Sequence, residues 1–142
     1  MPDKLEVTIE VIVHATENVD IILESFFEKF EIEADTFSKE NLTGHFENPI
    51  MLLRAKFKKK EAKKILEKLV KNIPENDFSQ IIDDIENRLQ DSNLHLRFGK
   101  QDLIKGRMIP REKDAIKMKV FTPSYKKEET VKNYVKLLTD SI

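Results

Sequence analysis

Cysteine is absent from this chain of 142 residues, and glycine occurs only three times. Without cysteine the chain has neither a disulfide framework nor a thiolate metal site, a composition that suits a reducing cytosol. With so few glycines it has no phosphate-cradling loop of the P-loop or dinucleotide-binding type. No apolar run approaches the roughly 20 residues needed to cross a bilayer, and no signal-type apolar segment follows Met1. We therefore expect a cytoplasmic protein without a membrane partner.

Side chains suited to catalysis or metal binding are also few and scattered. His14, His45 and His95 fall in different predicted elements, without the spacing of a metal-ligand set. No serine lies in a nucleophile elbow. The sequence therefore predicts no catalytic residue, no metal and no cofactor, and we do not expect an enzyme.

Charge, by contrast, is abundant and arranged in blocks. Residues 54–71 hold nine basic side chains against two acidic ones, whereas residues 1–53 hold twelve acids against three lysines. Residues 72–94 are again acidic and residues 95–142 again basic, so that the net charge of −1 conceals a polarised molecule. A basic patch on a small protein is first of all a candidate phosphate-binding surface.

Hydrophobic periodicity predicts four clear strands and four helices. Alternation of apolar and polar residues indicates the strands, and apolar stripes at helical spacing indicate the helices. The expected strands cover residues 5–13, 50–57, 94–98 and 116–121, with a weaker extended stretch near 32–43; the expected helices cover 19–30, 59–72, 78–89 and 126–139. Thr16 is the expected cap of the first helix, and Asn76 with Asp77 that of the third.

These elements predict an α+β fold. Each helix has one apolar stripe and each clear strand one strongly apolar face, so we expect the helices to pack on one face of a largely antiparallel sheet. The chain shows no internal repeat, low-complexity tract or flexible linker. Residues 1–142 are therefore expected to form a single domain.

The face of the sheet without helices would be basic outside the first strand. The basic side chains expected there come from three strands: Arg54, Lys56, Arg97, Lys117 and Lys119. One interpretation is ordinary cross-strand pairing with Glu6 and Glu10 of the first strand. The other is a surface that docks RNA through its phosphates, with Phe121 as a stacking ring.

A second basic surface lies on the helix predicted over residues 59–72. Four of its lysines, at positions 60, 64, 68 and 71, share one stripe, which a solvated helix face would explain. Lys58, Lys59 and Lys60, however, cluster at the helix N-terminus, where the helix dipole disfavours cations. A role other than helix stability, such as phosphate binding, would favour them there.

The turn before the second clear strand carries a distinctive pattern, Gly44-His45-Phe46-Glu47-Asn48-Pro49-Ile50. Gly44 can adopt positive φ, Asn48 can close an Asx turn, and Pro49 restricts its predecessor, so a plain hairpin turn is one interpretation. With this turn, the chain resembles an archaeal family of RNA-binding proteins described as predicted exosome subunits. The other matching segments are Val13–Glu17, Leu94–Gln101, the basic segment after the turn, and the closing strand and helix. The resemblance covers nearly the whole chain in the same order.

This resemblance implies a curved sheet similar to that of the ribosomal protein that binds 5S ribosomal RNA. It also implies RNA as the partner and a possible place in an RNA-processing complex. The predicted contacts to the RNA backbone, of low sequence specificity, are Arg54, Lys56, Lys58, Lys59, Lys60, Arg97, Lys100, Lys117, Lys119, His45 and Asn48. His45 and Asn48 are expected to flank Lys100 at one end of the sheet. The alternative is a self-assembling or protein-docking subunit with complementary charge patches.

Overall fold

The computed structural model describes residues 4–43, 48–123 and 127–142. Its elements are β1 (Glu6–His14), α1 (Val19–Phe30), η2 (Ala34–Thr36), β2 (Ser38–Thr43), β3 (Pro49–Lys58), α2 (Lys59–Asn72), α3 (Glu75–Asp83), η4 (Ile85–Arg88), β4 (Leu89–Gln90), β5 (Asn93–Gly99), α4 (Lys100–Ile104), β6 (Ala115–Phe121) and α5 (Lys127–Asp140), where η marks a 3-10 helix. The strand and helix pattern predicted from the sequence is confirmed for the elements that build the core.

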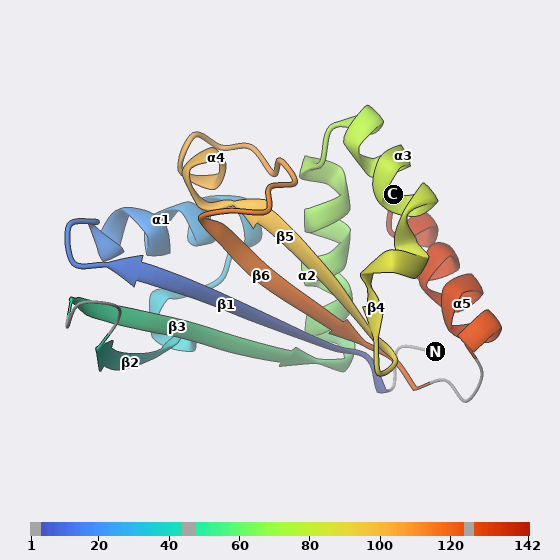
Figure 1. Cartoon of the computed structure of the whole chain (residues 1–142), viewed down its shortest axis with the longest axis horizontal. Coiled ribbons are helices and arrows are strands. Elements are labelled where there is room, and N and C mark those ends of the chain that lie inside the picture. Colours follow the sequence, from blue (N-terminus) through green and yellow to red (C-terminus); the bar gives the residue numbers. More distant parts are fainter. Residues whose placement is uncertain (1–3, 44–47, 124–126) are drawn as a thin grey trace.

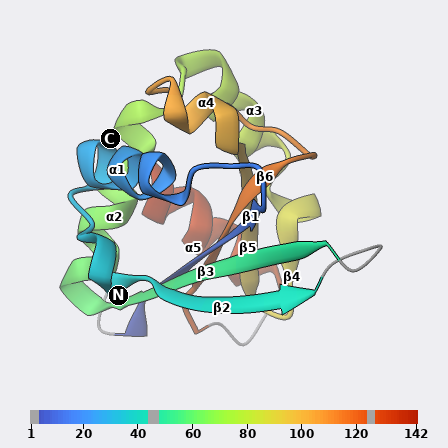
Figure 2. The same cartoon turned by 90° about the vertical axis from the view of Figure 1, so that its left-hand side faces the viewer.

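All the strands join one antiparallel sheet in the order β2-β3-β1-β6-β5-β4. Figure 1 looks onto the strands, with α2 crossing behind them. Figure 2, turned by 90°, shows α1 and α2 on one side of β2 and β3. The predicted α+β architecture, with helices on one face of an antiparallel sheet, is therefore confirmed. We call the opposite side of the sheet the open face.

The core follows from the alternation along the strands and the stripes on the helices. In β1 every second residue from Val7 to Val13 is buried, while the intervening side chains point to the open face. On α2 the buried stripe is Ala62, Ile65, Leu66, Leu69 and Val70. Neither α2 nor α5 exceeds 14 residues, and within the described ranges no helix is long and apolar enough to span a membrane.

Two helix starts differ from the sequence prediction. The cap of α1 is Asn18, whose Oδ1 accepts the backbone N–H of Asp20 at 2.9 Å; Thr16 lies in the turn before it. The third helix begins at Glu75, directly after Pro74, so that Asn76 lies inside its first turn. It also ends earlier than predicted, at Asp83, because the chain tightens into η4 and then turns into β4.

Helix α5 is fastened to the sheet by Tyr134, a fully buried side chain. The hydroxyl accepts the backbone N–H of Thr122 at 3.1 Å and lies 2.6 Å from the carbonyl oxygen of Ser92. Burial raises the pKa of Tyr134 to about 12. The hydroxyl therefore stays protonated and joins α5 to the ends of β5 and β6.

Candidate nucleic-acid interface

The β5–β6 half of the open face carries a strip of side chains that we call the β5–β6 strip: His95, Arg97, Lys117 and Lys119. The strand register places His95 directly opposite Lys119, and Arg97 directly opposite Lys117. All four residues are exposed. Among the described residues, no carboxylate forms an ion pair with Arg97, Lys117 or Lys119. Like charges opposite one another are unfavourable in a sheet unless an anion neutralises them.

The charge of the strip is reflected in the titration of His95. Partial burial, together with the positive charges of Lys119 and Arg97, lowers the pKa of the His95 imidazole below its ordinary value. At neutral pH this histidine is therefore mainly uncharged and can both donate and accept a hydrogen bond. The cations that the strip offers to an anion are Arg97, Lys117 and Lys119.

The β1–β3 half of the open face is different, because its cations are already paired. Arg54 Nε donates to Glu10 Oε2 at 2.8 Å, and Lys56 Nζ lies 3.1 Å from Glu6 Oε1. The hydrogen bond to Glu10 and the charge of that carboxylate raise the pKa of Arg54. Here the structure shows the cross-strand pairing that was one interpretation of the sequence. Arg54 and Lys56 are thus less available to an outside anion than the strip.

The lysine cluster between β3 and α2 lies at the end of the sheet that holds Phe121. Lys58 and Phe121 are both register partners of Glu6, on opposite sides of β1, and Phe121 is half-buried on the open face. Lys59 begins α2 with a left-handed φ of 56°. Lys58, Lys59 and Lys60 are exposed. The lysine cluster therefore adds positive charge at the end of β3, next to Glu6 of β1. It lies two strands away from the β5–β6 strip.

Lys100 requires a correction. Its side chain is only 1% exposed, and its ammonium lies 2.6 Å from Glu17 Oε1 and 2.8 Å from Asp114 Oδ1. It also donates to the carbonyl oxygen of Ile12 at 2.8 Å. A lysine satisfied in this way is not available to bind RNA, so the prediction of Lys100 as an RNA contact is wrong. The physical reason is that the first residue of α4 points into the protein, where two carboxylates compensate its burial.

The predicted grouping of His45 and Asn48 around Lys100 is tested only in part. Pro49 at the start of β3 and Gly99 at the end of β5 do lie at the same end of the sheet, beside the end of β1. Asn48 is exposed, and His45 falls outside the described residues. No hydrogen bond joins Asn48 to Lys100 or Gln101. With Lys100 buried, the pocket expected there lacks its cation.

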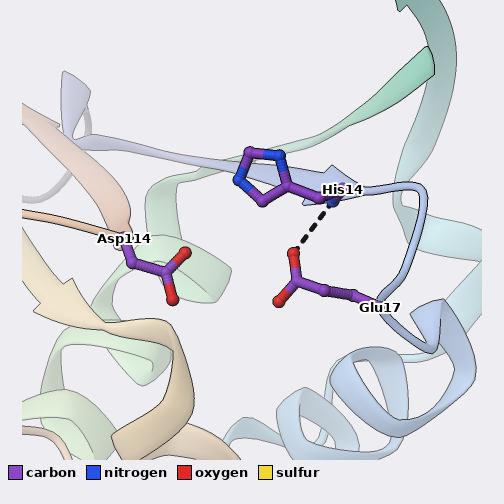
Figure 3. Close-up of side chains that lie close together, drawn as sticks. All are labelled: His14, Glu17 and Asp114. Atoms are coloured by element: carbon purple, nitrogen blue, oxygen red, sulfur yellow. Dashed lines mark hydrogen bonds between the residues drawn. The ribbon is translucent and has the colours of Figure 1, made fainter. Parts of the chain in front are cut away.

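One group of potential metal ligands does come together: His14, Glu17 and Asp114, whose ligand atoms lie within 4.8 Å of one another (Figure 3). Glu17 also accepts the backbone N–H of His14 at 2.9 Å. Burial alone would raise the pKa of both Glu17 and Asp114, but hydrogen bonds from Lys100 help to lower each below its ordinary value. The ammonium of Lys100 therefore already supplies the positive charge that a metal would bring. Sequence patterns did not predict this cluster, because its members are up to 100 residues apart along the chain.

His95 takes no part in that cluster. Its register partner Lys119 faces Thr8 on β1, six residues before His14, a separation of about 20 Å along the strand. His14 and His95 therefore lie too far apart to bind one metal ion.

Comparison with known proteins gives a consistent result. A protein-family model described as RNA binding matches residues 6–122. An uncharacterised protein of Methanocaldococcus jannaschii is 33% identical over 140 residues, covering 91% of this chain and 93% of that protein. A DUF54 protein from Methanothermobacter thermautotrophicus has a structure similar to this one with a TM-score of 0.78 and 27% identity, covering 96% of this chain and 99% of that one. A DUF54 structure from Archaeoglobus fulgidus gives a TM-score of 0.80 and 26% identity, covering 93% and 97%.

Proposed function

The chain belongs to this archaeal RNA-binding family, and on that premise we propose that it is a non-catalytic protein whose β5–β6 strip contacts the sugar-phosphate backbone of RNA. The observation that carries the proposal is the contrast across the open face. Arg54 and Lys56 are paired with carboxylates of β1, whereas Arg97, Lys117 and Lys119 are exposed and without an ion pair in the described part of the chain. Phosphates are the anions best suited to neutralise such a row of cations.

The geometry of the strip suits backbone contact. Arg97 offers a planar guanidinium that can hold a phosphate with two hydrogen bonds, and the two lysines act as point charges beside it. Contacts of this kind position RNA without reading its sequence. We therefore propose that affinity comes mainly from phosphates. Lys58, Lys59 and Lys60 form a second, more distant contact for a longer RNA.

The proposal also includes a cellular location and a partner complex. The absence of cysteine supports a cytoplasmic protein. The family resemblance supports work with an RNA-processing complex, for which the exosome is the candidate. The family resemblance also supports a sheet used in the manner of the 5S RNA-binding ribosomal protein. The alternative is a charge-docked protein subunit. The pairing of Arg54 and Lys56 with the acids of β1 in the same chain counts against the use of these two cations in RNA binding and in docking alike, and the proposal therefore rests on the strip.

Salt-dependent binding tests the strip. Wild-type protein should bind a labelled RNA hairpin with a log-log salt slope of roughly −3 to −4, as expected for four or five phosphate contacts. The triple variant Arg97→Ala, Lys117→Ala, Lys119→Ala should bind more weakly, with a slope shallower by about 2. Gel-shift or fluorescence-anisotropy titrations at four salt concentrations provide the measurement.

The matched control removes the same charge from α2 outside the Lys58–Lys60 cluster, through Lys63→Ala, Lys64→Ala and Lys71→Ala, of which Lys64 and Lys71 are exposed and Lys63 is half-buried. This variant should retain most of the affinity and slope. If it loses binding while the strip variant binds like wild type, the strip proposal fails and α2 becomes the RNA-binding surface.

A further inference from the structure

A hollow of about 380 Å³ opens at the β4 edge of the open face, and we call it the β4–β5 hollow. Its lining combines two carboxylates, two amides and three basic side chains: Asp84, Glu112, Asn87, Gln90, Arg88, Arg97 and His95, with Leu89 as the apolar member. Its volume falls at the lower end of the roughly 300–1,000 Å³ typical of small-ligand sites. That room suits a single nucleotide and excludes a base pair stacked within a duplex.

Several polar groups of the hollow have capacity to spare. Arg88 Nε is buried and makes no hydrogen bond. Its nearest carboxylate oxygen, Asp84 Oδ2, lies 3.5 Å away, which is an ion-pair distance. Neither the amide of Gln90 nor the carboxylate of Glu112 makes a side-chain hydrogen bond or ion pair with the rest of the described chain. Asn87 uses only its amide N–H₂, donating to Asp84 Oδ1 at 2.6 Å. The amide of Gln90, the side-chain carbonyl of Asn87 and the carboxylate of Glu112 are therefore free to hydrogen-bond a ligand in the hollow.

The hollow is continuous with the strip. His95 and Arg97 belong to both, being successive outward residues of β5 and therefore about 7 Å apart. A phosphate on Arg97 and Lys117 would place the attached nucleoside beside His95, at the mouth of the hollow. Duplex RNA cannot enter it, because its bases are paired and stacked, whereas bases in loops and bulges are free to turn outward.

We propose that the β4–β5 hollow binds one unpaired nucleotide of the RNA held by the strip, and that it favours a base with an exocyclic amino group. Glu112 supplies the free carboxylate that accepts from such an amino group, while the amides of Gln90 and Asn87 complete the base edge. Uracil has no amino group, and its one base-edge donor, the N3–H, lies between two carbonyl oxygens that would also face the Glu112 carboxylate unfavourably. The inference rests on the proposed function, since it takes the strip as the holder of the backbone.

Five hairpins with one stem and loop test the inference, four of them with a single bulged guanosine, adenosine, cytidine or uridine and one without a bulge. We expect wild-type protein to bind the three amino-bearing bulges about tenfold more tightly than the unbulged hairpin, and the uridine bulge less than threefold more tightly. Glu112→Gln should remove the discrimination against uridine while retaining affinity for the unbulged hairpin. Glu24→Gln on α1, also exposed, makes the same charge change as a control and should leave the discrimination intact.

The outcomes separate the hollow from the strip. Equal binding of all five hairpins, with the salt slope still dependent on the strip, overturns the hollow and leaves the proposed function standing. Discrimination that survives in Glu112→Gln overturns the role of that carboxylate. Failure of every hairpin to bind overturns the proposed function and the hollow together.

Discussion

At the scale of single residues, the most consequential side chain is Lys100, whose surroundings the sequence did not show. The hydrophobic alternation that ends at Phe98, and the polar Gln101 after it, indicated only that a strand ends there and a turn begins. The carboxylates that surround it come from residues 83 and 14 positions away, and such pairings depend on tertiary contacts that local periodicity does not encode. The burial of the residue was therefore missed, although its position at the end of β5 was predicted correctly.

Replacing Lys100 with Met should destabilise the protein by about 3 kcal/mol, because it leaves two carboxylates close together without their shared cation. Chemical unfolding at pH 7 measures the loss. Lys105→Met, an exposed lysine just after α4, is the matched control and should unfold close to wild type. An unchanged midpoint for the Lys100 variant would show that the ion pairs contribute little.

The same cluster predicts how stability responds to acid. The folded-state pKa values of Glu17 and Asp114 lie below their ordinary values of 4.5 and 3.8, so the stability they provide is fully present above about pH 5. It is lost as the pH falls through the lowered pKa values. The difference in unfolding free energy between wild type and Lys100→Met should therefore be largest at neutral pH and shrink below pH 4.

At the scale of secondary-structure elements, the sequence predicted most where periodicity was strong. The bounds of α2 agree with the predicted helix over residues 59–72, and β3 extends the predicted strand by one residue at each end. The third helix was predicted too long, because Ile85 and Leu89 continue its apolar spacing while the chain has already changed to η4 and β4. Both forms bury the same apolar residues, so the pattern alone cannot distinguish them.

The pairing between β1 and β3 leads to a prediction at this scale. Glu6→Gln together with Glu10→Gln should strengthen RNA binding severalfold and steepen the salt slope by about 1, because Arg54 and Lys56 then become free to contact phosphates. The stability of the fold should change little, since exposed ion pairs contribute little. The same anisotropy titrations provide the measurement. Glu24→Gln with Glu28→Gln, two exposed residues of α1, controls for net charge.

An unchanged slope in the β1 double variant would mean that RNA does not approach the β1–β3 half of the open face. Such a result would confine the contact to the β5–β6 strip and the hollow beside it. It would therefore narrow the interface without contradicting the strip itself.

At the scale of the whole molecule, the charge blocks of the sequence form two halves of the open face. The cations of the β1–β3 half are paired with carboxylates, whereas those of the β5–β6 strip are not, within the described residues. The sequence identified the basic strands and the face they share, because side-chain alternation fixes that face once the core side is known. It could not show which cations the acids of β1 neutralise, since that depends on the strand order β3-β1-β6. Placing β1 at the centre gives Glu6 and Glu10 neighbours on both sides, yet both carboxylates pair with β3.

The proposed absence of catalysis leads to the last prediction. Purified protein should leave labelled RNA intact in the presence of Mg²⁺ or Mn²⁺, because the carboxylates of the His14, Glu17 and Asp114 group already share the ammonium of Lys100. A divalent ion would have to displace that ammonium and leave it buried without its partners, which is unfavourable. Denaturing gels after long incubation, with and without EDTA, measure cleavage. Metal-dependent degradation that disappears in His14→Ala would make the cluster an active site and overturn the proposal of a non-catalytic protein.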